Sequence, residues 1–174
     1  MTKIQIIDTA SGEVVSRDSS EMNNEDMATE ALNQFGYAFE NQLIDVQVGE
    51  IHSDICLHFD RPMGEVRFTY GLLVKGELSS VAVMTGSQPY KGKLCFDVGY
   101  ATKEDKKRKG YGRDVVTKAI DELSNGMFRN GVRSFYLEMK VEASNLGSNA
   151  IASSIATESE FGENMNRYFK LIEL

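Results

Sequence analysis

Apolar residues in this chain follow two spacings, one typical of strands and one typical of helices. Short runs rich in β-branched and aromatic residues, bounded by turn-forming residues, predict strands. These runs are residues 3–7, 55–59, 65–74, 79–84, 94–102, 134–141 and 168–172. Apolar residues spaced three and four apart predict helices instead, in the segments 27–39, 115–127 and 146–155.

The first helix has a clear start and an open end. Asn23 or Asn24 can cap it, and acidic residues follow in the first turn, where the helix dipole favours carboxylates. Gly36 weakens the helix near its middle. We therefore leave its end open between Phe35 and Leu43.

The order of these elements predicts an α/β fold. A strand and a helix come first, an antiparallel meander follows, and the chain ends with helix, strand, helix and strand. The short turn Lys75-Gly76-Glu77 joins two of the meander strands as a hairpin. The sheet is therefore mixed, with helices covering its faces. Because no internal repeat or linker-like segment interrupts it, residues 1–174 are predicted to form one domain.

Composition bounds the class of protein. The chain has 174 residues, is 41% hydrophobic and carries a net charge of −7, which argues against a surface devoted to nucleic acid or anionic membranes. No apolar run is long enough to span a bilayer, and the first residues contain no stretch of signal-peptide length. We expect a cytoplasmic protein that does not enter membranes.

The cysteines and histidines give no sign of a disulfide framework or a metal site. Cys56 and Cys95 are far apart and form no CxxC motif, so we expect two buried thiols in a reducing compartment. His52 and His58 stand six apart beside Cys56, a spacing that fits no standard zinc pattern. No metal is predicted.

The densest positive charge lies in one short segment, KEDKKRKGYGR (103–113). It contains six basic and two acidic side chains within a chain that is acidic as a whole. Three interpretations compete: a solvated surface loop, a nucleic-acid or localisation patch, and a cradle for a phosphate-bearing cofactor. Localisation signals usually lie in disordered segments, whereas this one stands between a predicted strand and a predicted helix.

The glycines of this segment favour the cradle. A helix start offers unpaired backbone N–H groups and about half a unit of positive charge. Gly110 and Gly112 lack a Cβ, so an anion can approach the backbone closely. The dinucleotide fingerprint fails because its third glycine is replaced by Val115, and no GxxxxGK[ST] motif exists. A pyrophosphate site remains the best physical interpretation.

These residues resemble the acetyl-coenzyme A signature of the GNAT superfamily of N-acetyltransferases, whose core reads (Q/R)xxGx(G/A). The register runs from Phe96 to Gly112 without a gap, with Lys107 where the family prefers Gln or Arg. Downstream, Asn145 and Ser148 are similar to the family's N-x-x-S/A step, and Glu160-Phe161 stands near its "GF". The resemblance covers about residues 54–174.

The resemblance implies a centrally splayed sheet and an acetyl-CoA site. The loop amides would hold the pyrophosphate, with basic side chains nearby, and the strand end at Ala101 and Thr102 would pair with the pantetheine arm. A backbone N–H there would also stabilise the oxyanion formed on attack. Asn145 would approach from the other side of the splay. The implied cofactor-binding residues are Ala101, Thr102, Lys107, Arg108, Lys109, Gly110, Tyr111, Gly112, Asn145 and Ser148.

Catalysis needs a neutral acceptor amine, and a general base can remove its proton. The resemblance makes Asp97 the candidate base, because it matches the carboxylate of the family's "EIGY" strand; a structural, solvent-facing carboxylate is the alternative. Glu138 on a neighbouring strand is the second candidate. Many family members place an acidic Tyr in the helix after the Asn step, but residues 149–158 contain none. The hydroxyls that could replace it are those of Ser153, Ser154 and Tyr168.

Three functions follow from these observations. The first is an acetyl-CoA-dependent N-acetyltransferase that moves an acetyl group to a primary amine by direct attack on the thioester. The second is a GNAT-like module that binds coenzyme A or a partner without transfer, as the missing Tyr allows. The third is a small nucleic-acid-associated protein that uses the basic loop. The acceptor would be a small molecule or a protein amine, and the acidic remainder of the chain favours a cationic one. A homodimer is left open.

Overall fold

The computed structural model describes residues 3–174. The helices are α1 (Asn24–Glu40), α2 (Tyr111–Arg129) and α3 (Leu146–Ile155). The strands are β1 (Lys3–Ile7), β2 (Val14–Asp18), β3 (Gln47–Val48), β4 (Ile55–Asp60), β5 (Arg67–Val74), β6 (Glu77–Tyr90), β7 (Lys93–Thr102), β8 (Ser134–Glu142), β9 (Glu158–Phe161) and β10 (Met165–Glu173).

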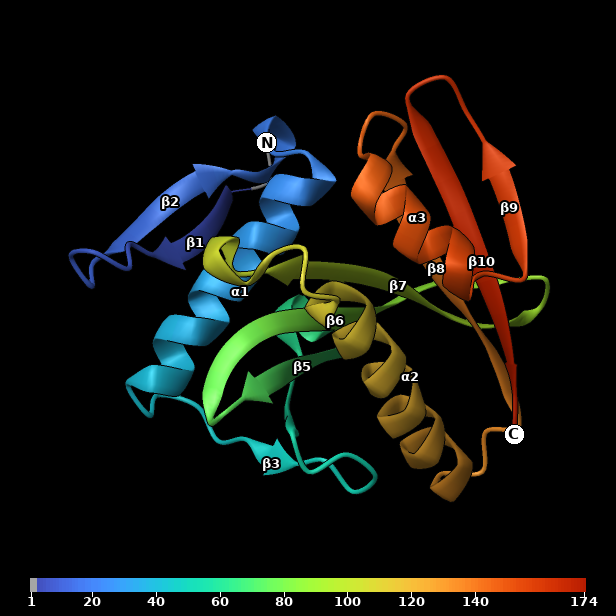
Figure 1. Cartoon of the computed structure of the whole chain (residues 1–174), viewed down its shortest axis with the longest axis horizontal. Coiled ribbons are helices and arrows are strands. Elements are labelled where there is room, and N and C mark those ends of the chain that lie inside the picture. Colours follow the sequence, from blue (N-terminus) through green and yellow to red (C-terminus); the bar gives the residue numbers. More distant parts are fainter. Residues whose placement is uncertain (1–2) are drawn as a thin grey trace.

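A mixed eight-stranded sheet forms the centre of the molecule (Figure 1). Its strand order is β3-β4-β5-β6-β7-β8-β10-β9, and β1 and β2 form a separate hairpin. Neighbouring strands of the large sheet are antiparallel, except that β7 and β8 run parallel. The predicted α/β class, with its antiparallel meander and flanking helices, is confirmed.

The sheet is splayed where β7 and β8 meet. These strands pair over only three positions, the last of which joins Asp97 to Glu138. Beyond that pair, β7 continues to Thr102 and β8 to Glu142 without pairing to each other. The two strands therefore leave unpaired edges that face one another across a gap, as the resemblance implies.

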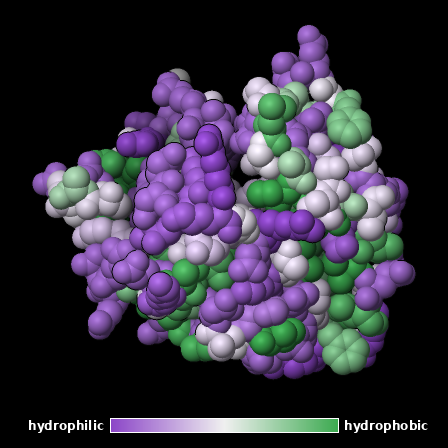
Figure 2. Space-filling view, viewed as in Figure 1, coloured by the Kyte–Doolittle hydropathy of each residue, from purple (hydrophilic) through white to green (hydrophobic). Residues whose placement is uncertain are grey.

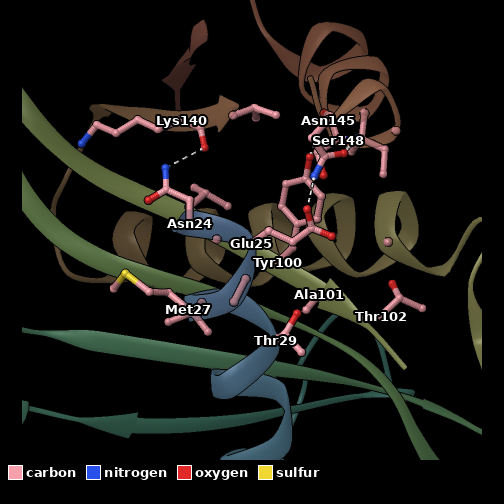
Figure 3. A pocket seen from close by; sticks show the side chains of 18 of the residues that line it. Asn24, Glu25, Met27, Thr29, Tyr100, Ala101, Thr102, Lys140, Asn145 and Ser148 are labelled. Atoms are coloured by element: carbon pink, nitrogen blue, oxygen red, sulfur yellow. Dashed lines mark hydrogen bonds between the residues drawn. The ribbon is translucent and has the colours of Figure 1, made fainter. Parts of the chain in front are cut away.

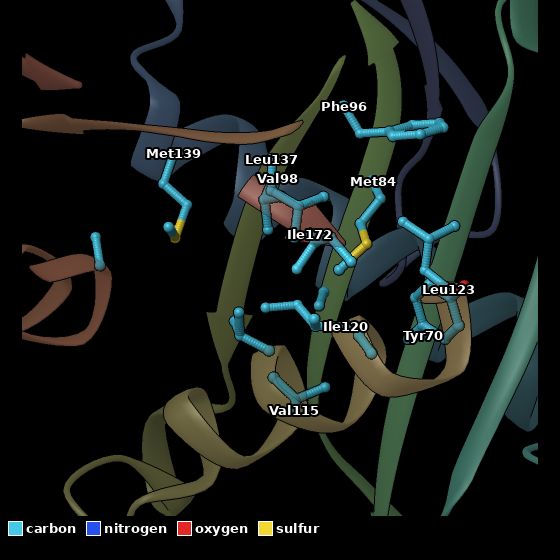
Figure 4. Close-up of a cluster of buried hydrophobic side chains, with 14 of the residues drawn as sticks. Tyr70, Met84, Phe96, Val98, Val115, Ile120, Leu123, Leu137, Met139 and Ile172 are labelled. Carbon is cyan, nitrogen blue, oxygen red and sulfur yellow. The ribbon is translucent and has the colours of Figure 1, made fainter. Parts of the chain in front are cut away.

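Alternation along the strands sends side chains to two separate cores. Phe96 and Val98 of β7 belong to the larger cluster, which packs under α2 and α3, whereas Ala101 packs against the cluster under α1. Figure 4 shows the larger cluster, where Leu123 of α2 lies over the sheet near Met84. Each fully buried side chain of this size contributes about 1.5–3 kcal/mol. The helices thus cover opposite faces of the sheet, α1 on one and α2 and α3 on the other.

Three strands are absent from the sequence prediction, namely β2, β3 and β9. Their sequences are short and polar, and each pairs with a strand that the sequence does predict: β2 with β1, β3 with β4, and β9 with β10. The edge of such a strand presents a row of unpaired backbone groups that a neighbouring segment can satisfy. These strands are therefore specified by their partners rather than by their own hydrophobic pattern.

The two longer helices run through their internal glycines. α1 passes through Gly36 and ends at Glu40, within the range left open between Phe35 and Leu43, whereas α2 continues past Gly126 to Arg129, beyond the predicted segment. A glycine inside a helix costs about 1 kcal/mol relative to alanine, a penalty that packing against the sheet outweighs. Gly36 is buried against the side chain of Leu78. The predicted start is confirmed in detail, since Asn23 caps α1 through a reciprocal capping box.

The predicted β5–β6 hairpin is confirmed. Val74 pairs with Glu77, and the two residues between them have positive φ, 55° for Lys75 and 82° for Gly76. Two positive φ values in a two-residue loop match the twist of the flanking strands. The turn sets the pairing of the two strands as far as Leu73, and the register shifts between Leu73 and Leu72.

The cysteines and histidines have contacts that fit structural roles. Cys56 and Cys95 are both free and buried, as predicted, and burial raises the pKa of each thiol to about 11. His52 lies 2.8 Å from an Asp121 carboxylate oxygen. Within residues 3–174, no group of three or more potential metal-ligating side chains gathers. No helix in this part of the chain has the length and hydrophobicity to cross a membrane.

Glu122 of α2 holds the segment before β4, and its loss should destabilise the fold. Its nearly buried carboxylate accepts the backbone N–H groups of Glu50, Ile51 and His52 at 2.8–3.0 Å. We expect Glu122→Ala to lower the free energy of unfolding by about 3 kcal/mol, because three part-buried backbone donors lose their charged acceptor. Urea denaturation measures this. Asp121→Ala on the exposed side of α2 is the control, with an expected loss below about 1 kcal/mol; equal losses would contradict the role of Glu122.

Candidate active site

A cavity of about 810 Å³ occupies the splay and is lined by α1, β7, β8, the basic loop, α2 and α3. Ligand sites are typically about 300–1,000 Å³. In Figure 2 the surface over the basic loop is almost uniformly hydrophilic, and a hollow separates it from α3. The predicted site residues that line the cavity are Asp97, Ala101, Thr102, Lys107, Arg108, Gly110, Tyr111, Gly112, Asn145 and Ser148. Lys109 does not line it.

The N-terminus of α2 opens into this cavity without a side-chain cap. Gly110 is the N-cap residue, with φ 83°, and no side chain accepts from the first turn. The first backbone bond of the helix runs from Asp114 N–H to the Gly110 carbonyl at 3.0 Å. The amides of Tyr111, Gly112 and Arg113 are therefore the usual orphan donors of a helix start. Such donors, together with the helix dipole, favour an anion.

Gly110 and Gly112 need to be glycine for different structural reasons. Gly110 has open space where a Cβ would stand, but its positive φ is one that side-chain-bearing residues rarely adopt. Gly112 has an ordinary helical backbone, and a Cβ there would lie 3.3 Å from both Ile151 and Thr102. Gly110 thus shapes the turn, whereas Gly112 lets the helix approach the end of β7. Both leave the backbone amides uncovered, which fits a pyrophosphate.

The basic side chains of the loop are not equally available. Lys107 pairs with a neighbouring glutamate at 2.7 Å, and Lys109 donates to a backbone carbonyl of the same loop at 3.1 Å. Arg108 and Arg113 form no ion pair with any residue in 3–174. Both line the cavity. Arg113 is missing from the predicted set because it follows the GYG motif. Its place in the first turn of the predicted helix would have indicated it as an anion-binding residue.

Asn145 joins three elements at the cavity. It caps α3 by accepting the Ser148 N–H at 3.0 Å, and it donates to the Glu25 carboxylate of α1 at 3.2 Å (Figure 3). Asn24 of α1 reaches β8 by donating to the Lys140 carbonyl at 3.4 Å. The start of α1 is thereby fixed to the ends of β8 and α3. This arrangement fixes the cavity wall opposite the basic loop.

Asp97 and Glu138 stand side by side where the strands part. Lys140 Nζ lies 3.1 and 3.2 Å from the two Asp97 oxygens and 3.7 Å from Glu138. Glu138 is nearly buried and also accepts from Arg167 at 2.7 Å, whereas the Asp97 side chain is 43% exposed. Asp97 is therefore the more accessible of the two predicted bases. Both line the cavity.

None of the hydroxyls predicted to replace the missing acid lines the cavity. Tyr168 is buried and donates to Asn149 at 2.8 Å, and Ser154 donates to a backbone carbonyl of its own helix. A different phenol, Tyr100 of β7, does line the cavity and donates to the Ser148 carbonyl at 2.9 Å. Burial raises the pKa of Tyr100 to about 12, so it gives up a proton reluctantly. The sequence prediction did not include Tyr100 in the site, because its residue type and spacing indicate only a strand.

The comparisons with known proteins concern structure. No protein-family model matches the sequence, and the search of curated proteins gave no match. Solved structures of similar arrangement include an acetyltransferase of the GNAT family from Streptococcus pneumoniae, at 15% identity and a TM-score of 0.47 over 61% of this chain and 66% of that one. The likeness is one of chain arrangement rather than of sequence.

Two further structures carry coenzyme A. RimL, a ribosomal L7/L12 α-N-protein acetyltransferase in complex with coenzyme A, is 17% identical, with a TM-score of 0.47 over 61% of this chain and 62% of its own. An acetyltransferase from Bacillus subtilis in complex with CoA is 18% identical, with a TM-score of 0.44 over 62% and 77%. The chain thus spans slightly less than two thirds of the first two proteins. At these values the likeness concerns fold alone and says nothing about the activity of this chain.

Proposed function

We propose that this GNAT-like chain is an acetyl-CoA-dependent N-acetyltransferase that acts on a primary amine. One observation carries the proposal: the uncapped N-terminus of α2 and the accessible carboxylate of Asp97 line one cavity at the splay. The first suits a pyrophosphate, and the second suits removal of a proton from an amine. A loop that bound only nucleic acid would not need the cavity behind it.

The residues around the splay fit coenzyme A in three parts. The amides of Tyr111, Gly112 and Arg113 would hold the pyrophosphate, with Arg108 as a free cation beside them. The unpaired edge of β7, up to Thr102, would bind the pantetheine arm as a neighbouring strand would. The apolar and polar lining of the gap then leads toward Asp97.

Acetyl-CoA supplies an acetyl thioester, and the chain's own residues prepare the amine that attacks it. Asp97 would take a proton from the acceptor ammonium, directly or through one water, because an ammonium has no lone pair. A backbone N–H of β7 beyond Asp97 would donate to the thioester carbonyl as negative charge develops there. Solvent would protonate the leaving thiolate, since a thiol of pKa about 8.5 is a good leaving group and Tyr100 is a weak acid.

Binding and turnover test the proposal separately. Isothermal titration with acetyl-CoA should show binding, and a thiol-release assay over a panel of amines should show turnover. Binding of acetyl-CoA without turnover of any amine would favour the alternative, a module that binds coenzyme A without transferring an acetyl group. Absence of binding at millimolar acetyl-CoA would contradict both. Nucleic-acid affinity that falls steeply with salt would then favour the basic loop as a nucleic-acid patch.

The acceptor should be cationic, and its turnover should depend on salt. Outside the basic loop and α2, four carboxylates line the cavity against two cations, Arg67 and Lys140; the carboxylates are those of Glu25, Asp97, Glu138 and Glu142. Such a field raises the local concentration of cations, and salt screens it. We expect initial rates for polyamines or lysine peptides to exceed those for acidic amines and to fall several-fold from low to high ionic strength. A preference for an acidic amine, or rates indifferent to salt, would contradict this.

A further inference from the structure

Lys140 places a primary amine of the chain itself beside the proposed base. Its Nζ lies 3.1 and 3.2 Å from the two oxygens of Asp97 and 3.7 Å from Glu138. The side chain is 41% exposed and lines the same cavity as the basic loop. An acceptor ammonium would need this same environment, with one carboxylate to take its proton and a second to hold its charge.

The strand register explains why the amine lies there. Asp97 and Glu138 form the last pair between β7 and β8, and Lys140 follows two residues later on β8. Residues two apart in a strand share a face, so Lys140 and Glu138 both lie on the face opposite the α2 and α3 core. Figure 3 shows the Lys140 side chain extended from β8, beside the start of α1. It is therefore on the acceptor side of the splay.

We propose that Lys140 is a self-acetylation site, an inference that rests on the proposed function. Asp97 takes a proton from the Lys140 ammonium, and the neutral Nζ attacks the carbonyl carbon of the bound acetyl thioester. A C–N bond forms and the C–S bond breaks. The thiolate leaves with the electron pair of the C–S bond. The attacking nitrogen loses its second proton to solvent, and the thiolate takes one up from solvent, giving Nε-acetyl-Lys140 and coenzyme A.

Acetylation changes the charges at the site. The amide of acetyl-Lys140 is neutral, so Asp97 loses its cation, whereas Glu138 keeps Arg167. The modified chain therefore presents a free carboxylate at the splay, open to an external ammonium. Before modification the Lys140 ammonium occupies the position beside Asp97 that an external ammonium would need. Self-acetylation would free Asp97 to bind that external ammonium.

Lys118 provides a matched control. Like Lys140, its ammonium is held by two carboxylates, those of Asp54 and Asp114, and its side chain is partly exposed. It lies on α2 and does not line the cavity. The two lysines thus share the pairing with two carboxylates but not the cavity, and their side chains are 20% exposed for Lys118 and 41% for Lys140.

The experiment incubates the purified full chain with acetyl-CoA and no acceptor, and follows each lysine by peptide mass spectrometry. We expect Lys140 to be acetylated at least about tenfold faster than Lys118, because a bound thioester beside an amine raises its effective concentration. The rate should be independent of protein concentration, and in Gly110→Asp it should fall to that of Lys118. Equal rates for the two lysines, or undiminished Lys140 acetylation in Gly110→Asp, would overturn the proposal.

A second readout needs no transfer. The chain is labelled with N-hydroxysuccinimidyl acetate in the presence and absence of desulfo-coenzyme A, which has no thiol for the reagent to acetylate. The ligand should protect Lys140 from labelling and leave the labelling of Lys118 unchanged. Failure of acetyl-CoA to bind would sink the proposed function and this inference together. Normal binding and normal turnover of external amines, with Lys140 unmodified, would sink this inference alone. Lys140→Arg should abolish the modification without disturbing the fold.

Discussion

Gly110→Asp and Gly112→Asp should each abolish detectable binding of acetyl-CoA while leaving the fold largely intact. Each change places a carboxylate against the uncapped amides of α2, where the pyrophosphate should lie. At both positions the new charge repels the ligand, and at Gly110, the N-cap position, the carboxylate also competes with an external anion for the first-turn amides. Isothermal titration measures the loss, and circular dichroism with urea denaturation measures the fold.

The control for Gly110 is Gly131→Asp. Gly131 follows the other end of α2, with φ 81° against 83° for Gly110, and at both positions the space within 4 Å of where a Cβ would stand is open. The strain of a side chain at such φ, about 1–2 kcal/mol, is therefore shared by both variants. We expect Gly131→Asp to bind acetyl-CoA normally. Normal binding by either loop variant would place the cradle elsewhere.

Gly112 allows a further separation. Gly112→Ala adds only the Cβ, which would press on Ile151 and Thr102 at 3.3 Å without adding charge. A binding loss smaller than that of Gly112→Asp would show that charge, and not crowding alone, excludes the ligand. The comparison therefore tests whether the site recognises an anion.

The strand and helix start that form the proposed cradle could be predicted from the sequence because they are close together along the chain. Strand, basic loop, glycines and helix start all fall between Phe96 and Val116, and helix capping is a local property. Asn145 was predicted only through its similarity to the family's N-x-x-S/A step, and the structure places it as the cap of α3.

What could not be predicted depends on register between distant segments. Lys140 lies beside Asp97 only because β7 and β8 run parallel and stop pairing at Glu138. A one-residue shift would turn Lys140 to the other face, and no local pattern fixes that register. The same reason hid Tyr100, whose hydroxyl reaches α3 across the splay. Chemistry that spans two strands requires the fold.

Asp97→Asn should lower turnover about a hundredfold or more, within the usual range for a general base, while acetyl-CoA affinity stays nearly unchanged. The substitution keeps the shape of the side chain and removes its ability to take a proton. Because an alkyl amine has a pKa near 10.4, more of it is neutral as pH rises, and the deficit should shrink accordingly. Initial rates across pH, with titration of acetyl-CoA, measure both effects. Normal turnover at neutral pH would reassign Asp97 to a structural role.

Two further variants test whether a loss of turnover in Asp97→Asn comes from the loss of a general base. Glu138→Gln removes the second candidate base, and a larger loss there than in Asp97→Asn would move the role to Glu138. Asp97→Asn also leaves the Lys140 ammonium without its closest carboxylate, so repulsion of a cationic acceptor could lower the rate by itself. The double variant Asp97→Asn with Lys140→Met removes that charge. If repulsion were the cause, the second substitution would restore turnover; if Asp97 is the base, the amine still has no proton acceptor and the rate stays low.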